Sequence, residues 1–122
     1  MTSPLHHIRL ELAREPGKPT GDPESGYDLV APLDADGRLD PTAMRDLGEP
    51  CRVRRFESND TVATGRLKHV GRDGWVLDFP GDAEDQTGFR FGEERFVLGE
   101  YVSVRAPDGD QHTFRVAQLR TL

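Results

Sequence analysis

A run of basic residues with aromatic residues among them, in the middle of the chain, could bind an anionic partner. Between Cys51 and Trp75 lie six basic and three acidic side chains, whereas the whole chain carries a formal net charge of −6. Cationic side chains attract phosphate or carboxylate groups, and aromatic rings can stack on nucleic-acid bases. The candidate binding residues are Arg52, Arg54, Arg55, Phe56, Arg66, Lys68 and Trp75.

Three interpretations of this basic strip are open from the sequence. An acidic chain is repelled by a phosphate backbone, which favours a protein partner over single-stranded RNA or DNA. In the third interpretation the arginines pair internally with Asp82, Glu84 and Asp85 and bind nothing. The neighbours Arg54 and Arg55 cannot face the same side of a regular strand, so we expect a bulge or an exposed edge at this point.

The best candidates for metal ligands are the acidic residues around Gly37. Asp34 and Asp36 precede this glycine with the spacing of an EF-hand calcium loop. The twelfth position of such a loop should be a bidentate glutamate, but in this chain it falls on Ala43. An Asx turn that leads into a helix capped by Asp40 explains the same residues without metal. We therefore expect no metal or other cofactor, with Asp34, Asp36 and Asp40 as the candidate ligands if one binds.

No group of residues in the sequence has the spacing of a catalytic motif. His6 and His7 are adjacent and point to opposite faces of a strand, while His69 and His112 lie on separate segments. The one cysteine, Cys51, begins a predicted strand, where a small core residue is expected. The sequence thus favours a non-catalytic binding or adaptor module, and a flavin-binding or metal-binding enzyme is the less favoured alternative.

Composition is typical of one small soluble domain spanning residues 1–122. The chain has 122 residues, of which 34% are hydrophobic, and it contains a single cysteine. A lone thiol fits a reducing compartment, and neither a signal peptide nor a long apolar segment is recognisable. We therefore expect a cytoplasmic protein without a membrane partner, as a monomer or a weak homodimer.

Short segments of alternating apolar residues predict a mainly β protein. The predicted strands are 5–14, 27–33, 51–57, 61–70, 74–79, 89–91 and 96–97, followed by a hairpin within 100–119. Prolines and glycines predict a loop over 15–26, and Asp40, Pro41 and Gly48 are the cap, first residue and stop of one short helix. Many short strands without crossover helices favour a small, mostly antiparallel, partly open β-barrel.

The last hairpin has a register that can be predicted from its turn. Pro107-Asp108-Gly109 is typical of a three-residue hairpin loop. Pairing outward from this loop places Val102 opposite Phe114, Val104 opposite His112, and Tyr101 opposite Arg115. The first two pairs then face the core, and Tyr101 and Arg115 face solvent, close enough for a cation–π contact.

Two resemblances accompany these patterns. The segment 99–103 resembles a strand of the ferredoxin-reductase-type flavin barrel, but the Arg-x-Tyr-Ser/Thr motif of that family is absent from 112–116. The phrases at 7–14, 31–37, 51–56, 99–103 and 112–116 resemble a small alphaproteobacterial protein family with no assigned activity. That resemblance implies a bacterial cytosolic protein and transfers no functional residue.

Overall fold

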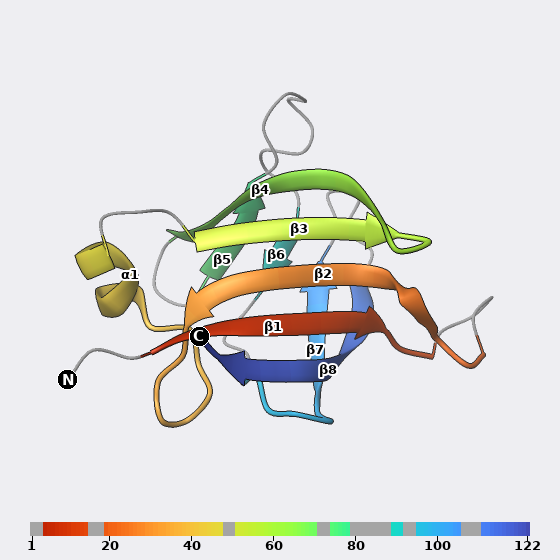
Figure 1. Cartoon of the computed structure of the whole chain (residues 1–122), viewed down its shortest axis with the longest axis horizontal. Helices are drawn as coiled ribbons and strands as arrows, with labels where there is room; N and C mark the ends of the chain where they lie inside the picture. The colour runs from red at the N-terminus through yellow and green to blue at the C-terminus, as the bar shows by residue number, and fades with distance from the viewer. Residues whose placement is uncertain are drawn as a thin grey trace.

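A computed structural model of the protein describes residues 4–14, 19–47, 51–70, 74–78, 89–91, 95–105 and 111–122. The described residues form eight strands and one short helix (Figure 1). The elements are β1 (Leu5–Leu12), β2 (Asp22–Pro32), α1 (Pro41–Leu47), β3 (Cys51–Glu57), β4 (Asp60–Val70), β5 (Gly74–Asp78), β6 (Phe89–Phe91), β7 (Tyr101–Arg105) and β8 (Gln111–Thr121).

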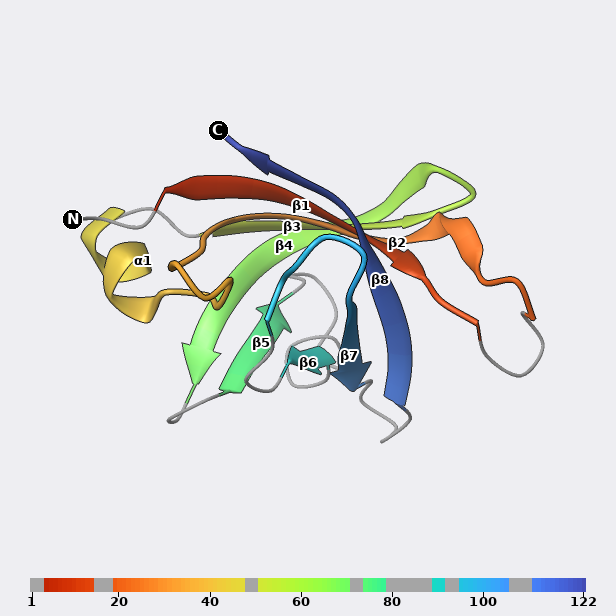
Figure 2. The ribbon, with the colours of Figure 1, turned by 90° about the horizontal axis from the view of Figure 1, so that it is seen from below.

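The strands pair in chain order, all antiparallel, and β8 pairs back with β1 to close a barrel. The predicted mainly β, antiparallel barrel with one short helix is confirmed. Figure 2 shows a strongly curved wall, in which the short strands β5, β6 and β7 lie across from β1, β2 and β3. The ring is thinnest between β6 and β7, where Arg90↔Arg105 is the one pair within the described residues.

Strand β2 is longer than the sequence pattern predicts. The predicted loop over 15–26 is wrong for residues 22–26, which belong to β2, and residues 15–18 lie outside the described part of the chain. Gly26 explains the difference, because a Cβ atom there would lie 1.8 Å from the Leu10 carbonyl oxygen of β1. This glycine therefore lets the two strands approach closely, next to a register shift between Glu11 and Leu12.

The predicted register of the last hairpin is confirmed. Val102 pairs with Phe114, Val104 with His112, and Tyr101 with Arg115. Val102, Val104 and Phe114 are buried, and Tyr101 is exposed. The turn residues 106–110 lie outside the described residues, and the cation–π contacts in the described part occur at Phe56 rather than at Tyr101.

Two further local predictions about strands have clear outcomes. The bulge expected at Arg54 and Arg55 does not lie in β3: the register shift between Arg55 and Phe56 in the pairing of β3 with β4 places the extra residue at Val62 of β4, and β3 pairs regularly with β2. The strand predicted at 96–97 is wrong: Phe96 and Val97 follow an isolated bridge between Arg38 and Arg95.

The barrel interior is filled by the inward apolar residues of the strands. Alternation in β1 places Ile8 and Leu10 inside, and both are fully buried. The helix α1 lies beside the C-terminal end of β2, at one end of the barrel (Figure 1). Within the described residues, no helix is both long and apolar enough to span a lipid bilayer.

Candidate functional site

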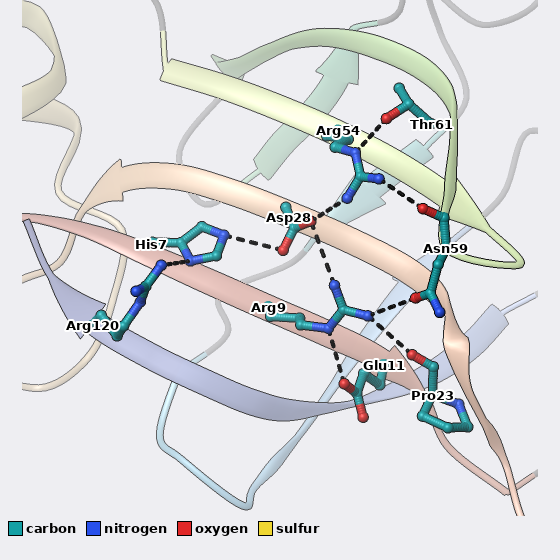
Figure 3. Close-up of polar contacts among 9 residues, drawn as sticks. All are labelled: His7, Arg9, Glu11, Pro23, Asp28, Arg54, Asn59, Thr61 and Arg120. Carbon is teal, nitrogen blue, oxygen red and sulfur yellow. Dashed lines mark hydrogen bonds and ion pairs between the residues drawn. The ribbon is translucent and has the colours of Figure 1, made fainter.

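The outer face of β1, β2 and β3 carries a polar cluster centred on Asp28 (Figure 3). Arg54 Nη1 donates to Asp28 Oδ2 at 2.7 Å, and Arg9 Nη1 lies 3.8 Å from the same oxygen. His7 Nε2 lies 3.1 Å from Asp28 Oδ1. The Asp28 side chain is only 14% exposed. Its carboxylate therefore interacts with these three neighbours in a region that water reaches poorly.

The contacts of His7 determine where its proton lies. Arg120 Nη2 lies 3.2 Å from His7 Nδ1, and a guanidinium nitrogen can only donate. In this arrangement Nδ1 accepts from Arg120 and Nε2 donates to Asp28, so His7 links β2 to the end of β8 across β1.

Phe56 lies beneath this cluster, on the outside of the barrel. It pairs with Gly26 and shares the outer side of β3 with Arg54, yet its side chain is 0% exposed. The guanidinium carbon of Arg9 lies 4.2 Å from the ring centroid, and that of Arg54 lies 5.3 Å from it. The two arginines therefore cover the ring and hold a cation–π contact each.

The turn between β3 and β4 holds Arg9 and Arg54 in place through hydrogen bonds. Arg9 Nη2 donates to Asn59 Oδ1 at 3.3 Å and to the Pro23 carbonyl at 3.1 Å. Arg54 Nη2 donates to the Asn59 carbonyl at 3.1 Å, and its Nε donates to Thr61. The Asn59 amide in turn donates to the Glu24 carbonyl at 2.9 Å. Polar contacts thus join the tips of both hairpins and hold these groups in one geometry.

The predicted basic strip divides into cations with and without acidic partners. Arg54 pairs with Asp28, Arg55 with Glu57 at 3.1 Å, and Lys68 with Asp78 at 2.6 Å. Arg52 and Arg66 are exposed and lie directly opposite each other on β3 and β4. Neither forms an ion pair with any described residue. The acidic segment 82–85, which the sequence offers as an internal partner, lies outside the described residues.

The two aromatic candidates do not offer an open ring face. Trp75 is 5% exposed and belongs to the cluster of core side chains inside the barrel. Phe56 is covered by Arg9 and Arg54. The structure therefore brings Arg52 and Arg66 together at the surface, with Lys68 on the same strand as Arg66, and separates Trp75 from them.

A groove lies at the end of the molecule where the β1–β2 hairpin extends beyond the barrel. Its volume is about 710 Å³. Its lining combines polar and apolar side chains from β1, β2, β7 and β8. The lining residues are Glu11, Leu12, Ala13, Arg14, Thr20, Asp22, Pro23, Tyr101, Thr113 and Arg115.

The predicted turn at Asp34 serves the backbone. Asp34 Oδ1 accepts hydrogen bonds from the amides of Asp36 at 2.8 Å and Arg38 at 3.0 Å. Asp40 Oδ1 accepts the Ala43 amide at 3.0 Å, which confirms Asp40 as the N-cap of α1. Within the described residues, no three His, Cys, Asp or Glu side chains gather as a metal would require.

Two buried titratable groups are shifted away from reactivity. Burial raises the pKa of the Cys51 thiol to about 11. Burial also raises the pKa of Tyr27 to about 12, an effect that the charge of Arg55 partly offsets and that of Glu57 reinforces. Both groups are therefore neutral at pH 7, and Cys51 lacks the thiolate that a nucleophile or metal ligand needs.

Sequence reasoning missed the Asp28 cluster and the groove. His7, Arg9 and Asp28 meet because β1 pairs with β2, with Arg9 opposite Asp28. The alternation of β1 indicates that His7, Arg9 and Glu11 face outward, and it is the one signal that could have suggested their common surface. Comparisons with known protein families, with curated proteins and with solved structures give no significant match.

Proposed function

We propose that the protein is a non-catalytic binding module that docks an acidic segment of a partner protein on the outer face of β3 and β4. The observation that carries this proposal is the exposed pair of Arg52 and Arg66, directly opposite each other and without an ion pair to any described residue. Like charges directly opposite on neighbouring strands destabilise a sheet. A carboxylate placed between the two guanidinium groups would remove that repulsion.

The surroundings of this pair suit a protein more than a nucleic acid. Thr64 and Lys68 are exposed on the same side of β4 as Arg66, and Val62, the extra residue at the register shift of β4, is 50% exposed. Side chains of this mixture pack well against a peptide. Single-stranded nucleic acid binds by stacking on aromatic rings, and both aromatic candidates, Phe56 and Trp75, are buried. The net charge of −6 further disfavours a polyanion as long as a nucleic acid.

The absence of catalysis in this proposal is supported by the state of the reactive groups in the described part of the chain. Asp28 and His7 are engaged with arginines rather than with a potential nucleophile. The Cys51 thiol is buried and protonated at pH 7. We place the module in the cytoplasm, because a lone thiol is compatible with a reducing compartment.

The test is a titration of the ¹⁵N-labelled full chain with an eight-residue poly-glutamate peptide and, separately, with an eight-nucleotide oligo-uridine. We expect saturable amide shifts along β3 and β4 with the peptide. The variant R52E/R66E should bind the peptide about tenfold or more weakly, since each lost guanidinium contact is worth roughly 0.5–1 kcal/mol and each new carboxylate repels the peptide.

The matched control is Arg105→Glu, which changes an exposed charge on β7, across the barrel from β3 (Figure 2). Its affinity for the peptide should equal that of the original protein. Equal affinity of R52E/R66E for the peptide would refute the proposal. Tighter binding of oligo-uridine than of the peptide at the same salt concentration would favour a nucleic-acid partner instead. A stable homodimer that forms through this face in sedimentation experiments would favour a second copy of the chain as the partner.

A further inference from the structure

The groove between the β1–β2 hairpin and the outer faces of β7 and β8 has the size of a small-molecule site. Its volume of about 710 Å³ lies within the range of roughly 300–1,000 Å³ that is typical of ligand pockets. Arg115 of β8 pairs with Glu11 of β1 on one side and with Tyr101 of β7 on the other, while Asp22 belongs to β2 and Arg14 follows β1.

The carboxylates of this groove are already engaged by donors of the protein. Glu11 Oε2 accepts from Arg9 Nε at 2.9 Å. Asp22 accepts from the Glu24 amide and from the Ser25 hydroxyl, each at 3.0 Å. Both carboxylates therefore already have hydrogen-bond donors, and Arg9 offsets the charge of Glu11.

The guanidinium groups of the groove are in the opposite situation. Neither Arg14 nor Arg115 forms an ion pair or hydrogen bond through its side chain with any described residue. Arg115 lies opposite Glu11, but the Glu11 carboxylate is occupied by Arg9. Two guanidinium groups without described partners thus face the groove, and we expect them to attract an anion.

Tyr101 adds a second kind of recognition. Its side chain is 60% exposed and lines the groove next to Arg115. Thr20 and Thr113 supply hydroxyl groups, and Leu12, Ala13 and Pro23 supply apolar surface. An exposed tyrosine beside an arginine can stack a planar ring while the guanidinium group binds an anionic substituent on that ring.

We infer that this groove binds a planar organic anion, an aromatic ring that carries a carboxylate or a phosphate group. Arg115 and Arg14 hold the anionic group, and Tyr101 stacks on the ring. The site is independent of the face formed by β3 and β4, because none of Arg52, Arg66 and Lys68 lines the groove.

The test is an NMR titration of the full ¹⁵N-labelled chain with two probes that share a ring and differ in their anionic group, 4-hydroxybenzoate and 4-hydroxyphenyl phosphate. Saturable shifts of the amides of Ala13, Arg14 and 113–115 support the site, and the probe that saturates at the lower concentration identifies the anionic group. Cyclohexanecarboxylate has the charge of 4-hydroxybenzoate without the aromatic ring, and it should bind about tenfold more weakly.

Variants separate the two contributions. Arg115→Gln should weaken both probes about tenfold. Tyr101→Leu should weaken the aromatic probes while leaving cyclohexanecarboxylate unchanged, and Tyr101→Phe should retain the original affinities. Arg45→Gln, the matched loss of an exposed charge on α1, should change nothing.

Several results would overturn the inference. Shifts that rise linearly with probe concentration, or that are equal in Arg115→Gln and the original protein, indicate no specific site. Shifts confined to β3 and β4 would place anion binding on the other face. Failure of the poly-glutamate titration, by contrast, leaves the groove unaffected, so the two proposals can fail separately.

Discussion

Asp28 is the residue on which the outer polar cluster depends. It contacts Arg54 at 2.7 Å and His7 at 3.1 Å, and Arg9 lies 3.8 Å away, while its own side chain is 14% exposed. Replacing it with asparagine removes the charge but keeps the size, which leaves two arginines without their common carboxylate. We expect Asp28→Asn to lower the free energy of unfolding by about 1.5–3 kcal/mol, measured by urea denaturation.

A second aspartate provides the matched control. Asp78 pairs with Lys68 at 2.6 Å, but the Lys68 side chain is 58% exposed. Solvent-exposed ion pairs contribute only about 0–1 kcal/mol. Asp78→Asn should therefore cost less than Asp28→Asn, and equal costs for the two variants would show that the cluster around Asp28 has no special role in stability.

Tyr27 makes the free energy of unfolding depend on pH in the alkaline range. Burial raises the pKa of Tyr27 to about 12, whereas the phenol of an unfolded chain has a pKa of about 10. Between these values the folded state keeps a proton that the unfolded state loses. Stability from this group is complete below pH 10 and falls as pH rises toward 12, by on the order of 2 kcal/mol.

Urea midpoints measured across this pH range test the contribution of Tyr27. The Tyr27→Phe variant has no phenol at position 27 that could ionise. Its free energy of unfolding should therefore fall less between pH 10 and 12 than that of the original protein. Tyr101→Phe, which removes the exposed tyrosine, should retain the full decrease. The same pH dependence in all three proteins would contradict the expectation.

At the scale of elements, the hairpin of β3 and β4 turns through two residues with positive φ. Ser58 has φ 51° and Asn59 has φ 63°, between the paired residues Glu57 and Asp60. This is the type I′ geometry, in which glycine and asparagine are preferred. Serine at the first position therefore carries strain. Ser58→Gly should stabilise the protein by about 0.5–1 kcal/mol in urea denaturation, and Ser58→Val should destabilise it.

The helix α1 depends on its N-cap, Asp40. The Asp40 carboxylate accepts the Ala43 amide at 3.0 Å, and its carbonyl accepts the Met44 amide at 3.1 Å. Asp40→Ala should cost about 1 kcal/mol of unfolding free energy. Addition of calcium should leave the melting temperature of the original protein unchanged, since ligand binding to the folded state would raise it. A calcium-dependent increase would instead assign Asp34, Asp36 and Asp40 to a metal site.

Elements with a local signal could be predicted from the sequence. The register of β7 and β8 follows from the turn at Pro107 and from strict alternation, because slipping by one residue would expose Phe114 and Val116. The helix cap at Asp40 is also local. In each case the residues that decide the structure lie within a few positions of one another.

Features that depend on distant pairing could not be predicted. Pro23 and Gly26 are typical of a loop, and they lie in β2 because Gly26 permits a close approach of β1. Phe56 is outside the barrel and yet buried, because Arg9 of β1 covers it together with Arg54. To predict either feature, one must know which strand lies next to the residue, and no local sequence pattern specifies that. The candidate groove likewise exists only once β1, β7 and β8 are neighbours.

At the scale of the whole molecule, the pairing of the described residues around the barrel is uneven. β1 is paired along most of its length with both β2 and β8. On the other side, β6 has three residues, and Arg90↔Arg105 is the one pair joining it to β7 within the described residues. A ring of strands opens first at its weakest ladder, because separating strands there breaks the fewest hydrogen bonds.

Native-state hydrogen exchange should detect this seam. Because β1 is paired on both sides, we expect its amides to have opening free energies close to that of global unfolding. The amides of β6 should have opening free energies that are lower by roughly 2 kcal/mol or more. The stabilising variant Ser58→Gly should slow exchange in β1 and leave β6 unchanged, because opening at the seam leaves the turn between β3 and β4 intact. If β6 and β1 respond equally to that variant, the barrel opens as one unit, and the seam has no independent opening.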